Sequence, residues 1–271
     1  MKDPSALRAA ATVIVLRDAA DTCELLMLRR HARSGFAADM WVFPGGVVDE
    51  ADGALDANHW AGIDPAALAA RFGLTAQQVL AHYVAAVRET FEEAGLLLAH
   101  RRDGSAPDLS DPLLLQLRND LADRTKTGNF AAWLAERDLV LDLDALTYLS
   151  HWVTPSVEPR RYDTRFFIGQ APADQVAGFD QQETTDQRWV TAADALAASK
   201  AGEMPMIYPT ILTLRWLRDH ATTQAATQAA NEQAKVRRIQ PHAELDEDDN
   251  FVRILHPDDP AYPHHLYEAS A

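Results

Sequence analysis

Three glutamates share one face of a segment that the sequence predicts to be helical, residues 85–98 (AAVRETFEEAGLLL). Residues three and four apart are neighbours on a helix, so Glu89 faces both Glu92 and Glu93, and these like charges repel each other. Such a face is either simply solvated or occupied by a cation. Arg88 precedes Glu92 by one turn and can pair with one carboxylate, which leaves the others available to a cation. A cluster of carboxylates with a backbone carbonyl suits Mg²⁺ or Mn²⁺.

The elements around these glutamates mix strands and helices without regular alternation. Two apolar runs at residues 10–17 and 23–30, separated by a polar turn, indicate paired strands. Thr75 and Gln78 in capping-box spacing, and Gly95 at the other end, delimit the glutamate helix. The other predicted elements are helices from Asp64-Pro65 and over 110–125, 129–138 and 208–231, and strands at 40–46, 145–155, 160–170 and 187–190. The mixture favours an α+β class or a helix–sheet–helix sandwich.

Composition narrows the class of protein. The formal charge of −15 argues against a general binder of nucleic acid, although a divalent cation could still admit a nucleotide-like substrate. Cys23 is the only cysteine, so an intrachain disulfide is excluded. Because the sequence has neither an apolar run of membrane-spanning length nor a signal-peptide core, we expect a cytoplasmic protein without a membrane partner. A homodimer is one open option for its assembly.

The chain of 271 residues fits one elaborated domain or two small ones. We predict a domain over residues 1–231 and a C-terminal extension over residues 232–271. In the extension, the β-prone segments 236–240 and 251–255 flank an acidic turn and predict a hairpin.

The segment RETFEEAGL, together with Gly46 and Asp52, resembles the Nudix box, G-x5-E-x7-R-E-U-x-E-E-x-G-U. Asp52 stands where the box has glutamate, and residues 53–87 stand where the box has only seven residues. With the pieces FPGGVVDEAD, RFGL, WVTP and RRYDTRFF, the chain from about residue 10 to residue 218 looks like the animal peroxisomal coenzyme A diphosphatase branch of this family. The resemblance implies an α/β/α sandwich with a loop–helix–loop box. It also implies hydrolysis of a nucleoside diphosphate linked to another group.

The resemblance assigns roles to the residues of the box. It makes Arg88 a group that orients the carboxylates, and it makes Glu89, Glu92, Glu93 and the carbonyl oxygen of Gly46 ligands of Mg²⁺ or Mn²⁺. A diphosphate brings several negative charges to an acidic protein, so divalent ions would neutralise both the substrate and the transition state.

The general base that activates water is open between three glutamates. A box glutamate, here Glu89, can serve, and some family members use a glutamate from a later loop instead. Glu183 lies in the loop before the predicted strand at residues 187–190, and Glu158 in a proline-rich loop is the second such candidate. Either loop acid could equally be an ordinary exposed side chain.

The substrate-binding residues are open as well. Arg160 and Arg161 could clamp a phosphate, or they could pair with Asp163 and nearby acids. The insertion could build an apolar wall beside the glycine loop, or it could pack on the outer surface of the domain. The residues proposed for that wall are Trp60, Ile63, Leu68, Phe72 and Leu74.

The sequence therefore predicts a Mg²⁺- or Mn²⁺-dependent Nudix hydrolase of coenzyme A or acyl-coenzyme A. One alternative is a Nudix pyrophosphatase for ADP-ribose, NADH or another dinucleotide. The other, of a different class, is a catalytically silent module that binds a nucleotide or a protein.

Overall fold

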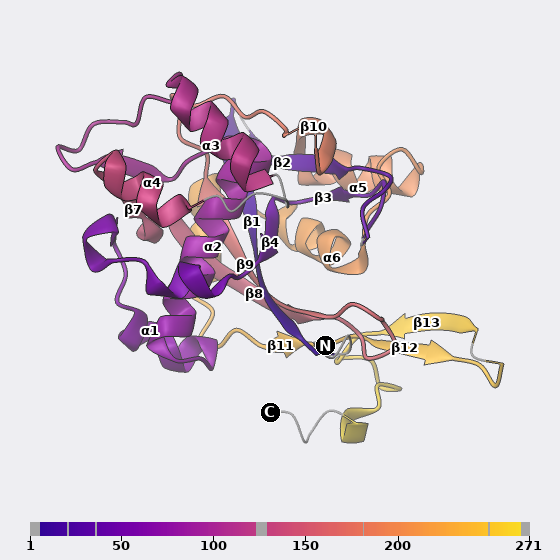
Figure 1. Ribbon diagram of the computed structural model, residues 1–271. Helices are drawn as coiled ribbons and strands as arrows, with labels where there is room; N and C mark the ends of the chain where they lie inside the picture. The colour runs from indigo at the N-terminus through magenta and orange to yellow at the C-terminus, as the bar shows by residue number, and fades with distance from the viewer. Residues whose placement is uncertain are drawn as a thin grey trace.

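The computed structural model describes residues 6–20, 22–35, 37–122, 129–180, 182–248 and 250–266. A mixed sheet with the strand order β10-β2-β1-β9-β8-β11 carries helices on both faces (Figure 1). Its central strands are β1 (Arg8–Ala19), β2 (Thr22–Arg30), β8 (Leu146–Val153) and β9 (Tyr162–Gln170). Strand β1 runs parallel to β9 and antiparallel to β2. The predicted α+β sandwich is confirmed.

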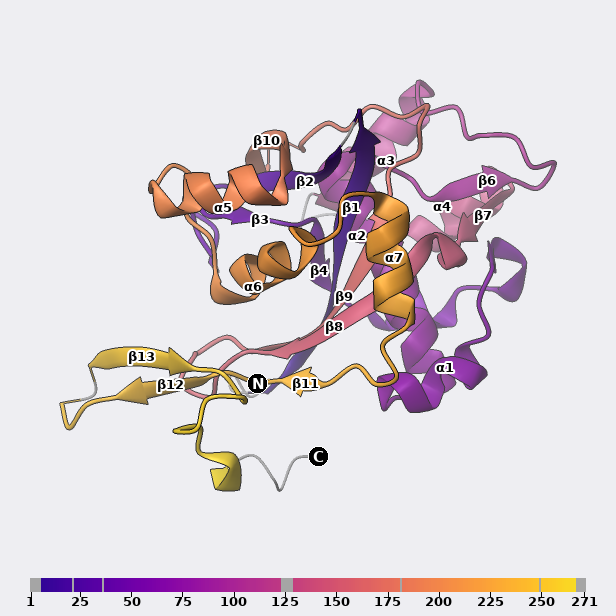
Figure 2. The same ribbon diagram turned by 180° about the vertical axis from the view of Figure 1, so that it is seen from behind.

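Each face of the sheet has its own apolar cluster, because successive side chains of a strand point to opposite faces. On β1, Val13 packs in the cluster under α2 (Ala76–Ala94), whereas Ile14 packs under α6 (Tyr208–Leu217) and α7 (Thr223–Asn231). Helix α2 lies in front of the sheet in Figure 1, and α7 lies in front in Figure 2. The two helices therefore cover opposite faces.

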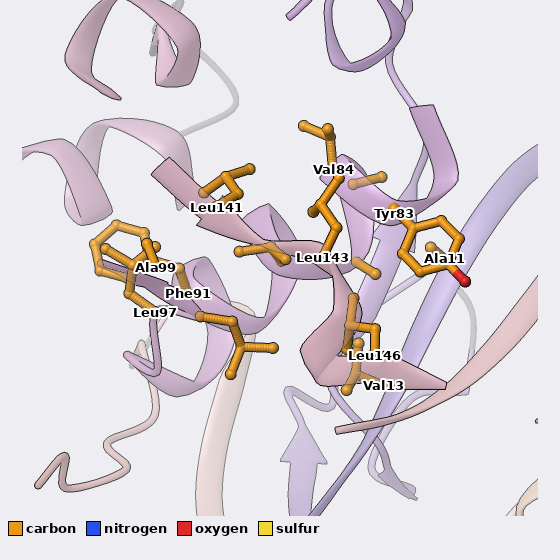
Figure 3. Packing of buried hydrophobic residues seen from close by; sticks show 14 of the residues in the cluster. Ala11, Val13, Tyr83, Val84, Phe91, Leu97, Ala99, Leu141, Leu143 and Leu146 are labelled. Carbon is orange, nitrogen blue, oxygen red and sulfur yellow. The ribbon is translucent and has the colours of Figure 1, made fainter. Parts of the chain in front are cut away.

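Helix α2 carries the glutamates, and its ends lie where the sequence predicts them. The Thr75 hydroxyl accepts a hydrogen bond from the Gln78 amide, and Gly95 ends the helix with a left-handed φ of 68°. Figure 3 shows the apolar side of α2, with Tyr83 and Phe91, inside the cluster on that face of the sheet. The helix is thus fixed to the sheet along its length.

Most of the insertion packs against the domain, although its residues Leu55 and Val84 line a cavity that also contains Gly45 and Gly46. The insertion begins at the end of the 3₁₀ helix η1 (Glu50–Ala54) and contains helix α1 (Pro65–Phe72) and the first turns of α2. The Phe72 ring stacks on Tyr148 of β8, with ring centroids 4.0 Å apart. Trp60, Ile63, Leu68 and Leu74 are partly buried against the α2-side cluster. None of these five residues lines that cavity, so the expectation that they build its apolar wall is wrong.

The remaining elements connect and extend these layers. The other regular elements that contribute are β3 (Trp41–Val42), β4 (Gly45–Val47), α3 (Pro112–Ala122), α4 (Phe130–Glu136), β10 (Thr184–Thr191) and α5 (Ala192–Lys200). A small sheet that the sequence analysis did not anticipate joins β5 (Trp60–Ala61), β7 (Leu139–Asp142) and β6 (Ala99–Arg101). The end of the helix predicted over residues 110–125 lies outside the described residues.

Two predictions near the C-terminus need correction. The single helix predicted over residues 208–231 is two helices, because Thr222 caps a new helix start by accepting from the Ala225 amide. The predicted hairpin exists, but β13 (Phe251–Leu255) pairs with β12 (His242–Leu245) and not with residues 236–240. From that segment, β11 (Arg238–Ile239) joins the main sheet beside β8. The helices that the structure describes are all too short or too polar to span a lipid bilayer.

Candidate active site

The glutamate face of α2 lies directly against the Gly45–Gly46 loop. The Gly45 amide donates a hydrogen bond to Glu93 Oε2 at 3.0 Å. A Cβ atom on Gly46 would collide with the carboxylate of Glu89, so only glycine fits there without a shift. The loop therefore brings its backbone within reach of two of the three glutamates, as the sequence analysis expects.

Arg88 ties the two halves of the box together across the insertion. Its Nε and Nη2 atoms each donate to an oxygen of Asp52 at 2.9 Å, and Nη2 also donates to the Val47 carbonyl at 2.8 Å. Its Nη1 atom donates to Glu89 and to Glu92, both at 2.9 Å. Asp52 is only 4% exposed, so this two-pronged ion pair is shielded from water. Asp52 thus acts as the partner of Arg88 despite its shorter side chain.

The box carboxylates are under electrostatic strain in this arrangement. Burial raises the pKa of Glu89 to about 8, with Glu92 adding to the rise and Arg88 opposing it. Burial likewise raises the pKa values of Glu92 and Glu93 above their usual range. A nearby cation would favour the charged forms of these groups.

The donor atoms suit a hard divalent cation, since they are carboxylate oxygens beside a backbone that can come close. In the described part of the chain, no group of three or more His, Cys, Asp or Glu side chains is already arranged to hold a metal ion. The reason lies in their present partners, because Glu89 and Glu92 turn toward Arg88 while Glu93 turns toward the Gly45 amide. The chemical type of the donors fits a metal, and Glu89 and Glu92 contact Arg88 through Oε1 alone, so each could turn its second oxygen to a metal while it keeps that contact.

Arg30 is a residue of this site that the sequence analysis missed. It ends β2, and its Nη1 and Nη2 atoms lie 3.8 Å from Glu93 Oε1 and 3.7 Å from Glu183 Oε2. Its Nε atom is buried without a hydrogen-bond partner among the described residues. The signal was present in the alternation of β2, because Leu26 and Leu28 face α2 and Arg30 follows on the same face.

The structure brings Glu183 close to the box. Glu183 raises the pKa values of both Glu92 and Glu93 by charge repulsion, and it lines the same cavity. Its position is fixed by Asp180, whose Oδ1 atom accepts hydrogen bonds from the amides of Gln182, Glu183 and Thr184 at 2.8–2.9 Å. Glu158 lines the cavity too, but its side chain is exposed. Proximity to the glutamates therefore favours Glu183 over Glu158.

The two arginines proposed to bind phosphate are separated. Arg160 lines the cavity, whereas Arg161 is not among its lining residues and directs its guanidinium to the Thr154 carbonyl at 3.4 Å. Asp163 pairs with His151 and Arg165 instead of with either of them. Of these two arginines, Arg160 is thus the one that lines the cavity.

The cavity that contains these groups has a volume of about 1340 Å³. It extends from the box along β1, β9 and β8 toward α6 and the C-terminal hairpin, with aromatic and basic residues on its walls. The wall on that side includes Arg8, Phe43, Trp152, Tyr162, Phe166, Ile207, Tyr208, Pro241 and Ile254. The contribution of Pro241 and Ile254 was not foreseen, because the folding back of the tail depends on long-range packing.

Comparison with known proteins gives consistent matches. The family model described as the NUDT19 Nudix domain matches residues 75–217. The acyl-coenzyme A diphosphatase NUDT19 of Xenopus laevis is 29% identical over 210 residues, covering 66% of this chain and 55% of the relative. The protein of the same name from Gallus gallus is 30% identical over 232 residues, covering 69% of this chain and 58% of the relative. The chain thus spans less than two thirds of the length of these curated relatives.

One solved structure is similar over nearly its whole length. The crystal structure of a NUDIX hydrolase from Alicyclobacillus acidocaldarius aligns with a TM-score of 0.68 at 30% identity. The alignment covers 82% of this chain and 96% of that chain. The arrangement of the sheet and helices, the glutamate helix with its glycine loop, and the matches to known proteins therefore all indicate the same family.

Proposed function

This chain belongs to the Nudix hydrolase family, and we propose that it is a diphosphatase of coenzyme A or its acyl esters. The observation that carries the proposal is the meeting of the box carboxylates, Glu183 and the basic residues Arg30 and Arg160 in one large cavity. Its volume of about 1340 Å³ exceeds the roughly 300–1,000 Å³ of typical ligand pockets, which suits a long substrate. The names of the relatives in Xenopus laevis and Gallus gallus support the same substrate class.

Nudix hydrolases generally use divalent metal ions, and we propose Mg²⁺ or Mn²⁺ here. The proposed ligands are Glu89, Glu92, Glu93 and the carbonyl oxygen of Gly46. When bound, the ion would neutralise the diphosphate and stabilise the charge that develops during attack by water. Arg88 would hold the carboxylates in place, since it already contacts two of them and is itself anchored by Asp52.

For the residues that act on water and substrate, the proposal extends to three side chains. Glu183 would accept the proton of the attacking water, because it lies in the cavity beside the box glutamates. Arg30 would bind a phosphate oxygen, since its guanidinium faces the same space and its Nε has no partner among the described residues. Arg160 would bind the 3′-phosphate of coenzyme A, which ADP-ribose and NADH lack. Glu89 is the alternative base if Glu183 proves dispensable.

Steady-state kinetics with product masses tests the substrate. The purified chain is assayed with Mg²⁺ or Mn²⁺ on coenzyme A, an acyl-coenzyme A, dephospho-coenzyme A, ADP-ribose and NADH. We expect 3′,5′-ADP and 4′-phosphopantetheine, or its acyl form, and a higher kcat/KM for coenzyme A than for its dephospho form. A clear preference for ADP-ribose or NADH would favour the dinucleotide alternative, and binding without hydrolysis of any compound would favour the silent module.

A cytoplasmic location and a homodimer are also proposals. Fractionation of cells that express the chain tests the location, and light scattering on the purified protein tests the assembly.

A further inference from the structure

The C-terminal end of the glutamate helix is held by an arginine that lies outside the box. Arg118 on α3 donates from Nε to the Glu92 carbonyl at 2.9 Å and from Nη2 to the Glu93 carbonyl at 3.1 Å. Helix ends leave their last carbonyls without intrahelical partners, and a cation there also interacts favourably with the helix dipole. Arg118 thus satisfies the backbone of the very residues whose side chains face the cavity.

The same guanidinium also holds the loop that leads to Glu183. Its Nη2 atom donates to the carbonyl of Gly178, whose own amide donates to the Ala94 carbonyl at 2.8 Å. Asp180, which fixes the backbone at Glu183, attracts the charge of Arg118. One side chain therefore joins the last turn of α2 to the turn that carries Glu183.

The chain makes room for this contact at Gly95. A Cβ atom there would lie 2.9 Å from Nη1 of Arg118, and the left-handed φ of 68° already favours glycine. Gln175 adds a second tie, because its amide group donates to and accepts from the backbone of Leu97 at 2.9 and 2.8 Å. The loop is thus fixed along the end of α2 at several points, with Arg118 nearest to the glutamates.

We propose that Arg118 is a positioning residue of the hydrolytic site, which sets the place of Glu183 relative to the last turn of the glutamate helix. This inference rests on the proposed function for the role of Glu183, but not on the identity of the substrate. Arg118 does not line the cavity and acts through the residues that do.

A double-mutant cycle tests the proposal on whichever diphosphate the wild type hydrolyses best. The variants are Arg118→Met, Glu183→Gln and their combination, with Arg102→Met as a control, since Arg102 pairs with Asp138 on the exposed surface. A positioned base contributes about 10²–10⁴-fold in rate, and a small misplacement can cost about 10²-fold. We therefore expect Arg118→Met to lower kcat about tenfold to a hundredfold with little change in KM. The double variant should be no slower than Glu183→Gln alone.

Several results would overturn this role. Losses that multiply in the double variant would mean that Arg118 acts independently of Glu183. Wild-type turnover in Glu183→Gln, or in a folded Arg118→Met protein, would also overturn the proposed role of Arg118. If Arg118→Met does not fold, the cycle is repeated with Arg118→Lys, whose single ammonium group should give a smaller loss of the same pattern.

Hydrogen exchange provides a readout that needs no turnover. The amides of Gln182, Glu183 and Thr184 are bonded to Asp180, so loosening of the loop exposes them to exchange. We expect faster exchange at these amides in Arg118→Met and unchanged exchange in Arg102→Met. Unchanged exchange in Arg118→Met would overturn the proposal even for a protein that hydrolyses none of the tested compounds.

Discussion

Replacing Asp52 by asparagine should lower the free energy of unfolding more than replacing any other single carboxylate near the box. Asp52 accepts hydrogen bonds from Nε and Nη2 of Arg88 and from the Asp49 amide, the last at 2.8 Å. An asparagine has one acceptor oxygen, so its NH₂ group would face a donor. Removing one partner of a buried ion pair costs about 3–5 kcal/mol, and here two buried donors of Arg88, Nε and Nη2, would each lose a carboxylate acceptor. At roughly 2–4 °C per kcal/mol, the melting temperature should fall by about 6–20 °C.

Urea and thermal unfolding of Asp52→Asn measure this loss, and Asp49→Asn is the matched control. Asp49 lies 3.7 Å from the same guanidinium, but its side chain is 67% exposed, so its removal should cost less than about 1 kcal/mol. Asp52→Glu restores the residue of the usual box, yet it should also destabilise, by about 1–3 kcal/mol, because it adds a methylene to a filled site. An Asp52→Asn protein no less stable than Asp49→Asn would refute the reasoning.

Three further predictions concern other residues. Glu93→Gln should abolish most activity, because a proposed metal ligand is lost. Without metal its melting temperature should hold or rise, since repulsion from Glu89 is relieved. Near-wild-type turnover at saturating Mg²⁺ would contradict the ligand role. Arg160→Met should reduce the preference for coenzyme A over dephospho-coenzyme A by roughly ten- to a hundredfold, from about 1.5–3 kcal/mol for a charge-assisted contact, whereas Arg161→Met should preserve it; kinetics on both substrates decides. Burial lowers the pKa of His82 from 6.5 to about 4, so the unfolded chain binds an extra proton between these values and stability falls as the pH drops. When the pH falls from 7.5 to 5, the free energy of unfolding of His82→Gln should therefore decrease by about 2 kcal/mol less than that of the wild type. Urea unfolding at both pH values measures this, and equal decreases would contradict the assignment.

Features encoded by neighbours in the sequence could be predicted. The ends of α2 follow from Thr75, Gln78 and Gly95, because helix caps depend on side chains within a few residues of the end. The pairing of β1 with β2 follows from two apolar runs joined by a short turn. The box glutamates were recognised because their spacing is fixed by the helix itself.

Features that depend on distant contacts could not be predicted. The break in segment 208–231 has a local signal, since Asp219, His220 and Thr222 are weak helix formers and threonine is a preferred N-cap residue, but the sequence alone also fitted a single helix. β11 pairs with β8, 87 positions earlier (Arg238 with His151), and so residues 236–240 were unavailable to β13. Arg161 follows Arg160 directly, yet its guanidinium binds the Thr154 carbonyl, a contact made by the folded loop before β9 that the sequence does not reveal.

The insertion explains why a box interrupted in sequence can remain whole in space. Asp52 and Arg88 lie 36 positions apart, yet they meet in the same two-pronged contact that a short loop could provide. Lengthening a loop costs little, since the closure entropy grows only with the logarithm of its length. The inserted chain also recovers free energy of its own, because Phe72 is buried on Tyr148 and the added turns of α2 extend the apolar side that packs on the sheet. The insertion therefore acts mainly as a brace, with only Leu55 and Val84 among its described residues lining the cavity. The contacts of Arg88 are the point at which the folding of the insertion and the geometry of the glutamates depend on each other.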